Sequence, residues 1–175
     1  DLLFAHMVSK HGLAQKLHCT FAGMVSSDVL LHSEQQGDEW RLCDQQQKNY
    51  LILRQQGEVF HDLAYIESLV KDYVRFSGQN FPHILQPLMK QHQVMINPQR
   101  PLVIYESMTL EFDRFSATSP ELRLAHNGLT VEGKRGLARL GFELVEHGEV
   151  IGRGEKRMIL SSLQPKVNLI LCFIA

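Results

Sequence analysis

Six consecutive residues, Gly-Gln-Asn-Phe-Pro-His at positions 78–83, combine side chains suited to proton transfer and carbonyl binding. His83 can give or take a proton near neutral pH, because the imidazole pKa lies close to that range. The amide of Asn80 can orient a carbonyl group or a water molecule, and Gly78 and Gln79 adjoin it. The commoner use of such residues is structural, with Asn80 as a helix cap and His83 packed at a helix start. We interpret His83 and Asn80 as candidate catalytic residues, and Gly78 and Gln79 as candidate ligand-binding residues.

The histidines and cysteines show no spacing typical of a metal centre. No two histidines stand in HxxxH or HExxH spacing. Cys19, Cys43 and Cys172 form neither a CxxC pair nor a disulfide framework. A glycine-rich phosphate loop and a nucleophile-elbow motif are also missing from the sequence. The spacing therefore predicts no metal site and no cofactor.

The composition indicates a globular chain and argues against several classes of partner. Apolar residues make up 44% of the 175 residues, which is enough to build a core. The formal net charge is −1 and no basic stripe is present, so we expect no nucleic-acid partner. The most apolar stretch, residues 167–175, is too short to span a bilayer, and we expect a buried strand or a packed terminus there. The cysteine usage and the lack of a secretory signal predict a cytoplasmic protein without a membrane partner.

The elements that position these residues follow from the period of the apolar residues. Residues 2–11 have helical spacing and end at Gly12. A second helix is expected to begin at an Asp62 cap and to end at Gly78, and a third to begin near Asn80 with Pro82 in its first turn. Gly37-Asp38 predicts a hairpin. Alternating apolar residues predict strands around positions 17–21, 108–112, 122–124, 138–144 and 149–160.

Two local echoes suggest an internal duplication. The segment 53–59 resembles 144–150, since both run from an apolar strand into Gly-Glu-Val. The strand at 17–21 parallels 110–115, and each follows a helix. The shared order of the two echoes favours a repeat of helix and strands. The alternative is an undivided α+β sheet in which similar turns recur by coincidence.

One helix wrapped by a coiled antiparallel sheet, present twice, is the plan of the double hot-dog fold. The sequence resembles the MaoC-like branch of that fold, and within it a group of uncharacterised bacterial proteins. The segments that carry the resemblance are residues 1–5, 12–13, 21–25 and 76–83. It implies an α+β double hot dog that handles a thioester of coenzyme A or acyl carrier protein. In the family an Asp and a His in the motif G-D-x-N-P-x-H activate water that adds to an enoyl thioester. The N-terminus of the central helix polarises the thioester carbonyl.

This chain departs from the family motif. Gln79 stands where the family has Asp, and an amide cannot accept a proton at neutral pH. His83 is also out of register by one residue. The resemblance therefore implies a degenerate second copy, and we expect the equivalent motif of the first copy to lie before Asp1.

The resemblance gives a set of expectations for the whole chain. Residues 1–60 would form a first hot-dog half, truncated at its N-terminus, residues 61–163 a second half, and residues 164–175 an apolar tail. We expect acyl-thioester binding, with enoyl-thioester hydratase or dehydratase activity left open, in a monomer or homodimer. One alternative is a non-catalytic hot-dog protein that acts as an acyl-ligand sensor or assembly subunit. Another is a thioesterase-type hot dog, for which Glu67 and Asp72 are the available helix carboxylates, although both are expected on a solvated face.

Overall fold

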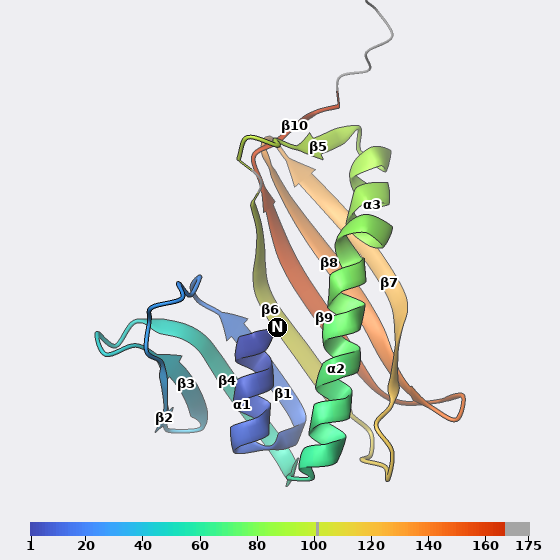
Figure 1. Ribbon diagram of the computed structural model, residues 1–175. Helices are drawn as coiled ribbons and strands as arrows, with labels where there is room; N and C mark the ends of the chain where they lie inside the picture. Colours follow the sequence, from blue (N-terminus) through green and yellow to red (C-terminus); the bar gives the residue numbers. More distant parts are fainter. Residues whose placement is uncertain (101, 167–175) are drawn as a thin grey trace, which may run out of the picture.

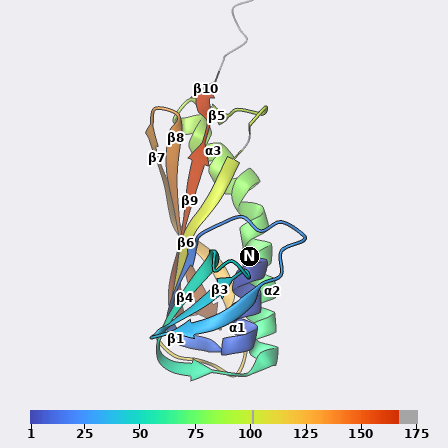
Figure 2. The ribbon, with the colours of Figure 1, turned by 90° about the vertical axis from the view of Figure 1, so that its left-hand side faces the viewer.

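The computed structural model describes residues 1–100 and 102–166, and it packs a layer of helices against one eight-stranded antiparallel sheet (Figure 1). Turned by 90°, the molecule shows its helices on one side of the sheet (Figure 2). In chain order, the elements are α1 (Leu2–His11), β1 (Leu13–Phe21), β2 (His32–Gln36), β3 (Glu39–Cys43), β4 (Asn49–Phe60), α2 (Leu63–Asn80), the π-helical turn η1 (Phe81–Leu85), α3 (Gln86–Gln91), β5 (Val94–Ile96), β6 (Leu102–Phe112), β7 (Glu121–Glu132), β8 (Arg135–Glu146), β9 (Glu149–Ser161) and β10 (Leu163–Pro165). The predicted α+β class is confirmed. None of the described helices is long and apolar enough to cross a membrane.

The order of the strands is the same in the two halves of the large sheet. The sheet runs β2-β3-β4-β1-β6-β9-β8-β7. From the outer edge inward, one half reads β2-β3-β4-β1 and the other reads β7-β8-β9-β6. In each half, therefore, the second strand along the chain is outermost, the third and fourth follow, and the first lies at the centre of the sheet. Each half is also preceded by helix, α1 before β1–β4 and α2 to α3 before β6–β9. The halves join through antiparallel pairing of β1 with β6, where Leu17 lies opposite Leu110.

Only one of the two sequence echoes falls at equivalent positions of the two halves. The strand echo falls on β1 and on the end of β6, which occupy matching places beside the centre of the sheet. The Gly-Glu-Val echo does not mark equivalent positions: Gly57 lies inside β4, whereas Gly148 forms the turn between β8 and β9. Both glycines have positive φ, 81° and 84°, so a shared need for left-handed backbone explains the likeness.

The face of the sheet that meets the helices carries the apolar positions of the predicted alternation. The core around α1 and α2 includes Leu17 and Cys19 of β1, Met108 of β6 and Phe142 of β8. A second apolar cluster lies under η1 and α3 and includes Leu140 of β8. The prediction for β7 is only partly right, because Leu124 is exposed at the outer strand of the sheet.

The long helix corrects two predictions about its ends. Asp62 caps α2 as predicted, its carboxylate accepting a hydrogen bond of 3.0 Å from the backbone N–H of Tyr65. Gly78 does not end the helix and Asn80 does not begin a new one, because α2 continues through η1 into α3. Pro82 has no N–H to donate to the preceding turn, and the wider π-helical turn accommodates that loss without a break.

Candidate functional site

Of the four predicted site residues, one is buried and three are exposed. Asn80 is 1% exposed, and neither its amide nitrogen nor its amide oxygen has a hydrogen-bond partner within residues 1–100 and 102–166. Gly78, Gln79 and His83 are exposed. The structure therefore directs Asn80 into the protein and leaves the other three residues on the surface of the helix.

Substitution of Gly78 by alanine is expected to stabilise the protein. A Cβ at this position would meet no atom within 4 Å, and alanine is preferred to glycine inside a helix by about 0.5–1 kcal/mol. We expect the free energy of unfolding in urea to rise by about that amount, with any ligand binding unchanged. Weakened binding in this variant would instead support the predicted ligand-binding role of Gly78.

The buried face of α2 changes from apolar to polar along its length. Ile66, Leu69, Tyr73, Ser77 and Asn80 follow one another at spacings of three or four residues, and all five are buried. The hydroxyl of Tyr73 has no hydrogen-bond partner among the described residues, as is also true of the Asn80 amide. Buried polar groups without partners are rare and costly, so the end of this face is a place where a ligand or water is needed.

Lys156 of β9 lies opposite this polar end of α2. Its side chain is 0% exposed, and its ammonium donates a short hydrogen bond to the hydroxyl of Ser77. The ammonium Nζ also lies 3.4 Å from a carboxylate oxygen of Asp1. Two aromatic rings cover it, those of Tyr73 and Tyr105, with centroids 4.8 Å and 4.1 Å away. We call Asp1, Tyr73, Ser77, Tyr105 and Lys156 the central polar cluster.

Burial sets the protonation of the groups in and beside this cluster. It lowers the pKa of Lys156 to about 7, because a charged ammonium is poorly solvated there. Burial also raises the pKa of the neighbouring Cys19 thiol to about 12 and holds the pKa of Tyr73 well above its usual value. At neutral pH Lys156 can thus both give and take a proton.

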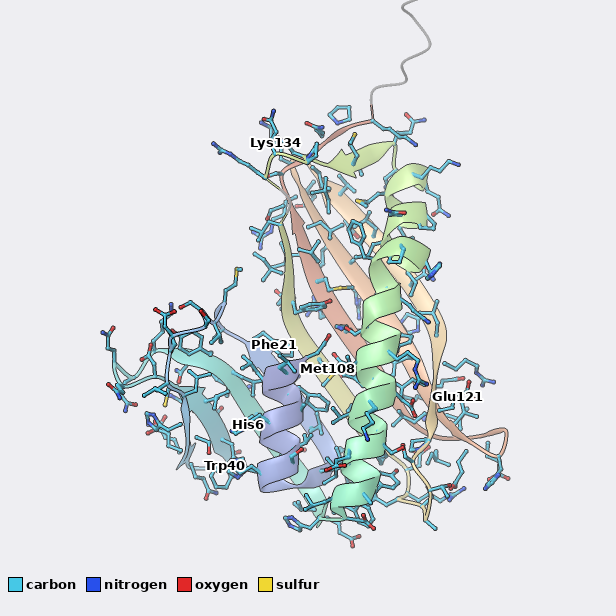
Figure 3. All side chains as sticks on the ribbon, viewed as in Figure 1. His6, Phe21, Trp40, Met108, Glu121 and Lys134 are labelled. Carbon is cyan, nitrogen blue, oxygen red and sulfur yellow. The ribbon has the colours of Figure 1, made fainter. Side chains whose placement is uncertain are left out.

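An apolar pocket of about 500 Å³ adjoins the central polar cluster. We call it the N-terminal pocket; it is lined by Asp1, Leu3, Phe21, Ala22, Gly23, Met24, Leu102, Val103, Ile104 and Tyr105. Phe21 lies close to the start of α1, and its ring centroid is 6.4 Å from that of Tyr105 (Figure 3). Asp1 and Tyr105 belong to both the pocket and the cluster. The walls of the pocket are therefore mostly apolar. The central polar cluster, which contains Lys156, adjoins the wall that Asp1 and Tyr105 form.

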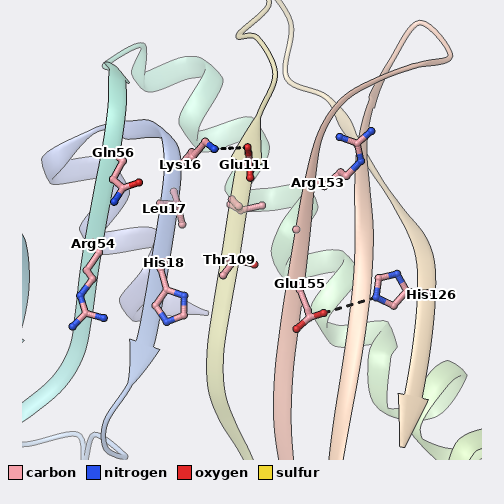
Figure 4. A pocket seen from close by; sticks show the side chains of 12 residues that line it. Lys16, Leu17, His18, Arg54, Gln56, Thr109, Glu111, His126, Arg153 and Glu155 are labelled. Carbon is pink, nitrogen blue, oxygen red and sulfur yellow. Dashed lines mark ion pairs between the residues drawn. The ribbon is translucent and has the colours of Figure 1, made fainter.

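A second hollow, of about 450 Å³, lies on the face of the sheet away from the helices (Figure 4). Its charged side chains are largely paired, with one another or with residues just outside the hollow: Lys16 lies 2.7 Å from Glu111, and Arg153 lies 3.6 Å from Asp113. Burial and then the charge of Arg54 lower the pKa of His18. An open, charge-compensated groove is a weaker candidate for chemistry than the N-terminal pocket.

Lys156 was missed by the sequence analysis although the sequence contains a signal for it. Lys156 lies two and four positions before the buried Met158 and Leu160 of β9. Because side chains alternate between the two faces of a strand, Lys156 is expected to point inward as they do. A lysine at an inward position of a central strand must be paired or functional. The carboxylates Glu67 and Asp72 behave as expected for a solvated face, since Glu67 is exposed and Asp72 pairs with Arg75 at 3.0 Å.

Comparison with known proteins places the chain in a family without assigning an activity. The family model described as a protein of unknown function, DUF3581, matches residues 1–168, and the chain belongs to this family. No curated protein matches the sequence. The crystal structure of an acyl-CoA thioesterase II, TesB2, from Mycobacterium marinum is similar, with a TM-score of 0.47 and 8% identity over 84% of this chain and 80% of that one. A likeness of this degree does not establish a shared fold or activity.

Proposed function

We propose that this member of the DUF3581 family binds an acyl thioester of coenzyme A or of acyl carrier protein in the N-terminal pocket. The observation that carries the proposal is the pocket itself, whose apolar lining ends at Tyr105 and Asp1. A volume of about 500 Å³ is ordinary for a small-molecule site, and the mixed lining suits a ligand with an apolar chain and a polar reacting end. The acyl chain would contact Phe21 and Val103, and the thioester end would lie toward Tyr105.

The repeated topology supports a hot-dog interpretation of the proposed site. We propose that residues 1–60 and 61–163 are two hot-dog halves, because each has helix followed by four strands in the same order. We propose that the ligand lies between the halves. The N-terminal pocket has this placement, since it is lined by the end of β1 from one half and the start of β6 from the other.

Hydration of an enoyl thioester is the second proposed function, and Lys156 is the observation that favours it. Addition of water across a double bond needs one group that removes a proton from water and one that returns a proton to carbon. A lysine whose pKa is about 7 can do both in turn. Asn80, buried one helical turn from Ser77, is proposed to orient the carbonyl or the water. His83 is exposed and contacts none of the pocket, whereas Lys156 lies behind its wall in contact with Asp1 and Tyr105, so proton transfer is proposed for Lys156 instead.

Filling the pocket tests the binding proposal. Replacement of Ile104 by tryptophan is expected to abolish the stabilisation that acyl-CoA gives in a thermal unfolding experiment, because the indole would occupy the space of the acyl chain. A ligand at about 100 times its dissociation constant stabilises the native state by about 2.7 kcal/mol, so its loss is easily measured. Replacement of Leu124 by tryptophan is the matched control, since Leu124 and Ile104 are both 36% exposed but only Ile104 lines the pocket.

A series of coenzyme A compounds distinguishes a hydratase from a thioesterase and from a non-catalytic binding protein. Crotonyl-CoA, longer enoyl-CoAs, saturated acyl-CoAs and free coenzyme A would be compared, with loss of the enoyl absorbance and release of thiol followed in parallel. Stabilisation with hydration supports the hydratase, and release of thiol identifies a thioesterase. Stabilisation without either reaction supports an acyl-ligand sensor or assembly subunit. If no acyl thioester stabilises the unsubstituted protein, the binding proposal is wrong.

A further inference from the structure

Three potential metal ligands of different chemistry meet on the hairpin of β2 and β3. His32 of β2 lies directly opposite Cys43 of β3 in the strand pairing. Glu34 lies two residues after His32, so its side chain emerges on the same face of β2. The register of the hairpin thus gathers an imidazole, a carboxylate and a thiol, and their donor atoms all lie within 4.8 Å of one another.

The distance between the Cys43 sulfur and the His32 imidazole nitrogen matches that of a tetrahedral zinc site. The Cys43 Sγ lies 3.5 Å from the His32 Nε2, and that nitrogen lies 3.9 Å from the Glu34 Oε2. Zinc binds thiolate sulfur at about 2.3 Å and imidazole nitrogen at about 2.0–2.1 Å, which in a tetrahedron separates the two ligands by about 3.5 Å. The Glu34 carboxylate lies farther from the imidazole than a zinc-bound carboxylate would, and its partly exposed side chain can move closer.

The surroundings of Cys43 are rich in acceptors and poor in donors. Its sulfur lies 3.8 Å from the carbonyl oxygen of His32 and 4.0 Å from the Gln47 Oε1. The thiol has only one weak S–H donor to offer these oxygens, the imidazole and the carboxylate of Glu34. A cation at this point would be coordinated by these lone pairs and would balance the negative charge of Glu34.

We propose that His32, Glu34 and Cys43 bind a zinc ion. Nitrogen, oxygen and sulfur together form a donor set that zinc accepts readily, whereas calcium and magnesium prefer oxygen alone. A fourth position remains for water or for Gln47, whose amide oxygen already lies near the sulfur. None of the three proposed ligands lines the N-terminal pocket, so this site is independent of acyl binding. The ion would tie β2, an outermost strand of the sheet, to β3.

Titration of the full chain with cobalt(II) tests the site, because a cobalt–thiolate bond gives a charge-transfer absorption that cobalt bound to nitrogen and oxygen alone lacks. We expect a saturable band with one ion per chain that zinc abolishes by displacement. Cys43→Ser should remove the band. Cys19→Ala, which alters the other described cysteine, should retain it, because Cys19 lies in the apolar core.

Two further variants keep the test decisive if Cys43→Ser folds poorly. His32 and Glu34 are partly exposed, so His32→Asn and Glu34→Gln should fold normally and weaken cobalt binding by about 100-fold or more. Absence of a saturable thiolate band, or a band that survives Cys43→Ser or His32→Asn unchanged, would overturn the proposal. Acyl-CoA stabilisation should be the same in Glu34→Gln as in the unsubstituted protein, which separates this proposal from the binding function.

Discussion

Replacement of Lys156 by methionine is expected to raise the free energy of unfolding at neutral pH by on the order of 1–4 kcal/mol. The lowering of the lysine pKa from 10.5 to about 7 shows that burial disfavours the ammonium. Methionine keeps the length of the side chain, adds apolar contact and removes that cost. The hydrogen bond to Ser77 is lost, but a serine within a helix can donate to a backbone carbonyl of the preceding turn.

The pH dependence of stability identifies Lys156 as the source of this effect. Between pH 7 and 10.5 the unfolded lysine carries a proton that the folded one has largely released, so the unfolded state binds more protons. The stability of the unsubstituted protein should therefore rise with pH across this window, with a slope approaching about 1.4 kcal/mol per pH unit. The advantage of Lys156→Met should be largest below pH 7 and shrink as the pH approaches 10.5.

Urea unfolding from about pH 6 to about pH 10 measures both effects. Lys71→Met is the matched control, because Lys71 is exposed on α2 and its replacement should leave the pH profile unchanged. Parallel profiles for the unsubstituted protein and Lys156→Met would contradict the assignment. A residue whose removal stabilises the fold is retained for another reason, so we also expect Lys156→Met to lose any hydratase activity.

Truncation of Phe142 to alanine is expected to destabilise the protein by about 3–5 kcal/mol. Phe142 of β8 is 1% exposed, and its ring packs against Tyr73 and Phe76 of α2 at centroid distances of 6.4 Å and 5.3 Å. On the neighbouring strand it covers Gly154, where any Cβ would collide with the ring. Removal of the ring leaves a cavity at the place where the long helix meets the sheet.

Phe81→Ala makes the same chemical change at a position that is 39% exposed. It should cost clearly less, because more than a third of the Phe81 surface is already in contact with water. Chemical denaturation monitored by circular dichroism would compare the two variants. Equal losses would show that Phe142 does not hold α2 on the sheet.

The sequence predicted the elements whose apolar residues are strictly periodic. Residues 2–11 form α1 as expected, and the Asp62 cap and the hairpin at Gly37-Asp38 are confirmed. The break predicted at Gly78 was wrong. Glycine and proline weaken a helix locally, but the buried face from Ile66 to Asn80 continues into that of η1 and α3, so tertiary packing outweighs the local preference.

The candidate sites depended on contacts that local spacing does not encode. Lys156 and Ser77 meet only because β9 crosses under the end of α2. His32 and Cys43 show no metal-binding spacing in the sequence, and only the hairpin register brings them together. The predicted division at residue 60, the MaoC-like resemblance and the cytoplasmic location remain predictions. The apolar tail at 167–175 lies outside the described residues.

The pairing of β1 with β6 also has a consequence for biosynthesis. On one edge, β1 pairs with β4 of the same half. Its other edge stays unpaired until β6, roughly 90 residues after β1 along the chain, has left the ribosome. At ordinary rates of translation this interval is on the order of 5–20 s. During it, a strand that carries Leu17 and Cys19 is a template for pairing with other chains. The nascent N-terminal half is therefore the stage at which this protein is most prone to aggregate, and closure of β1 on β6 is the expected slow step of folding.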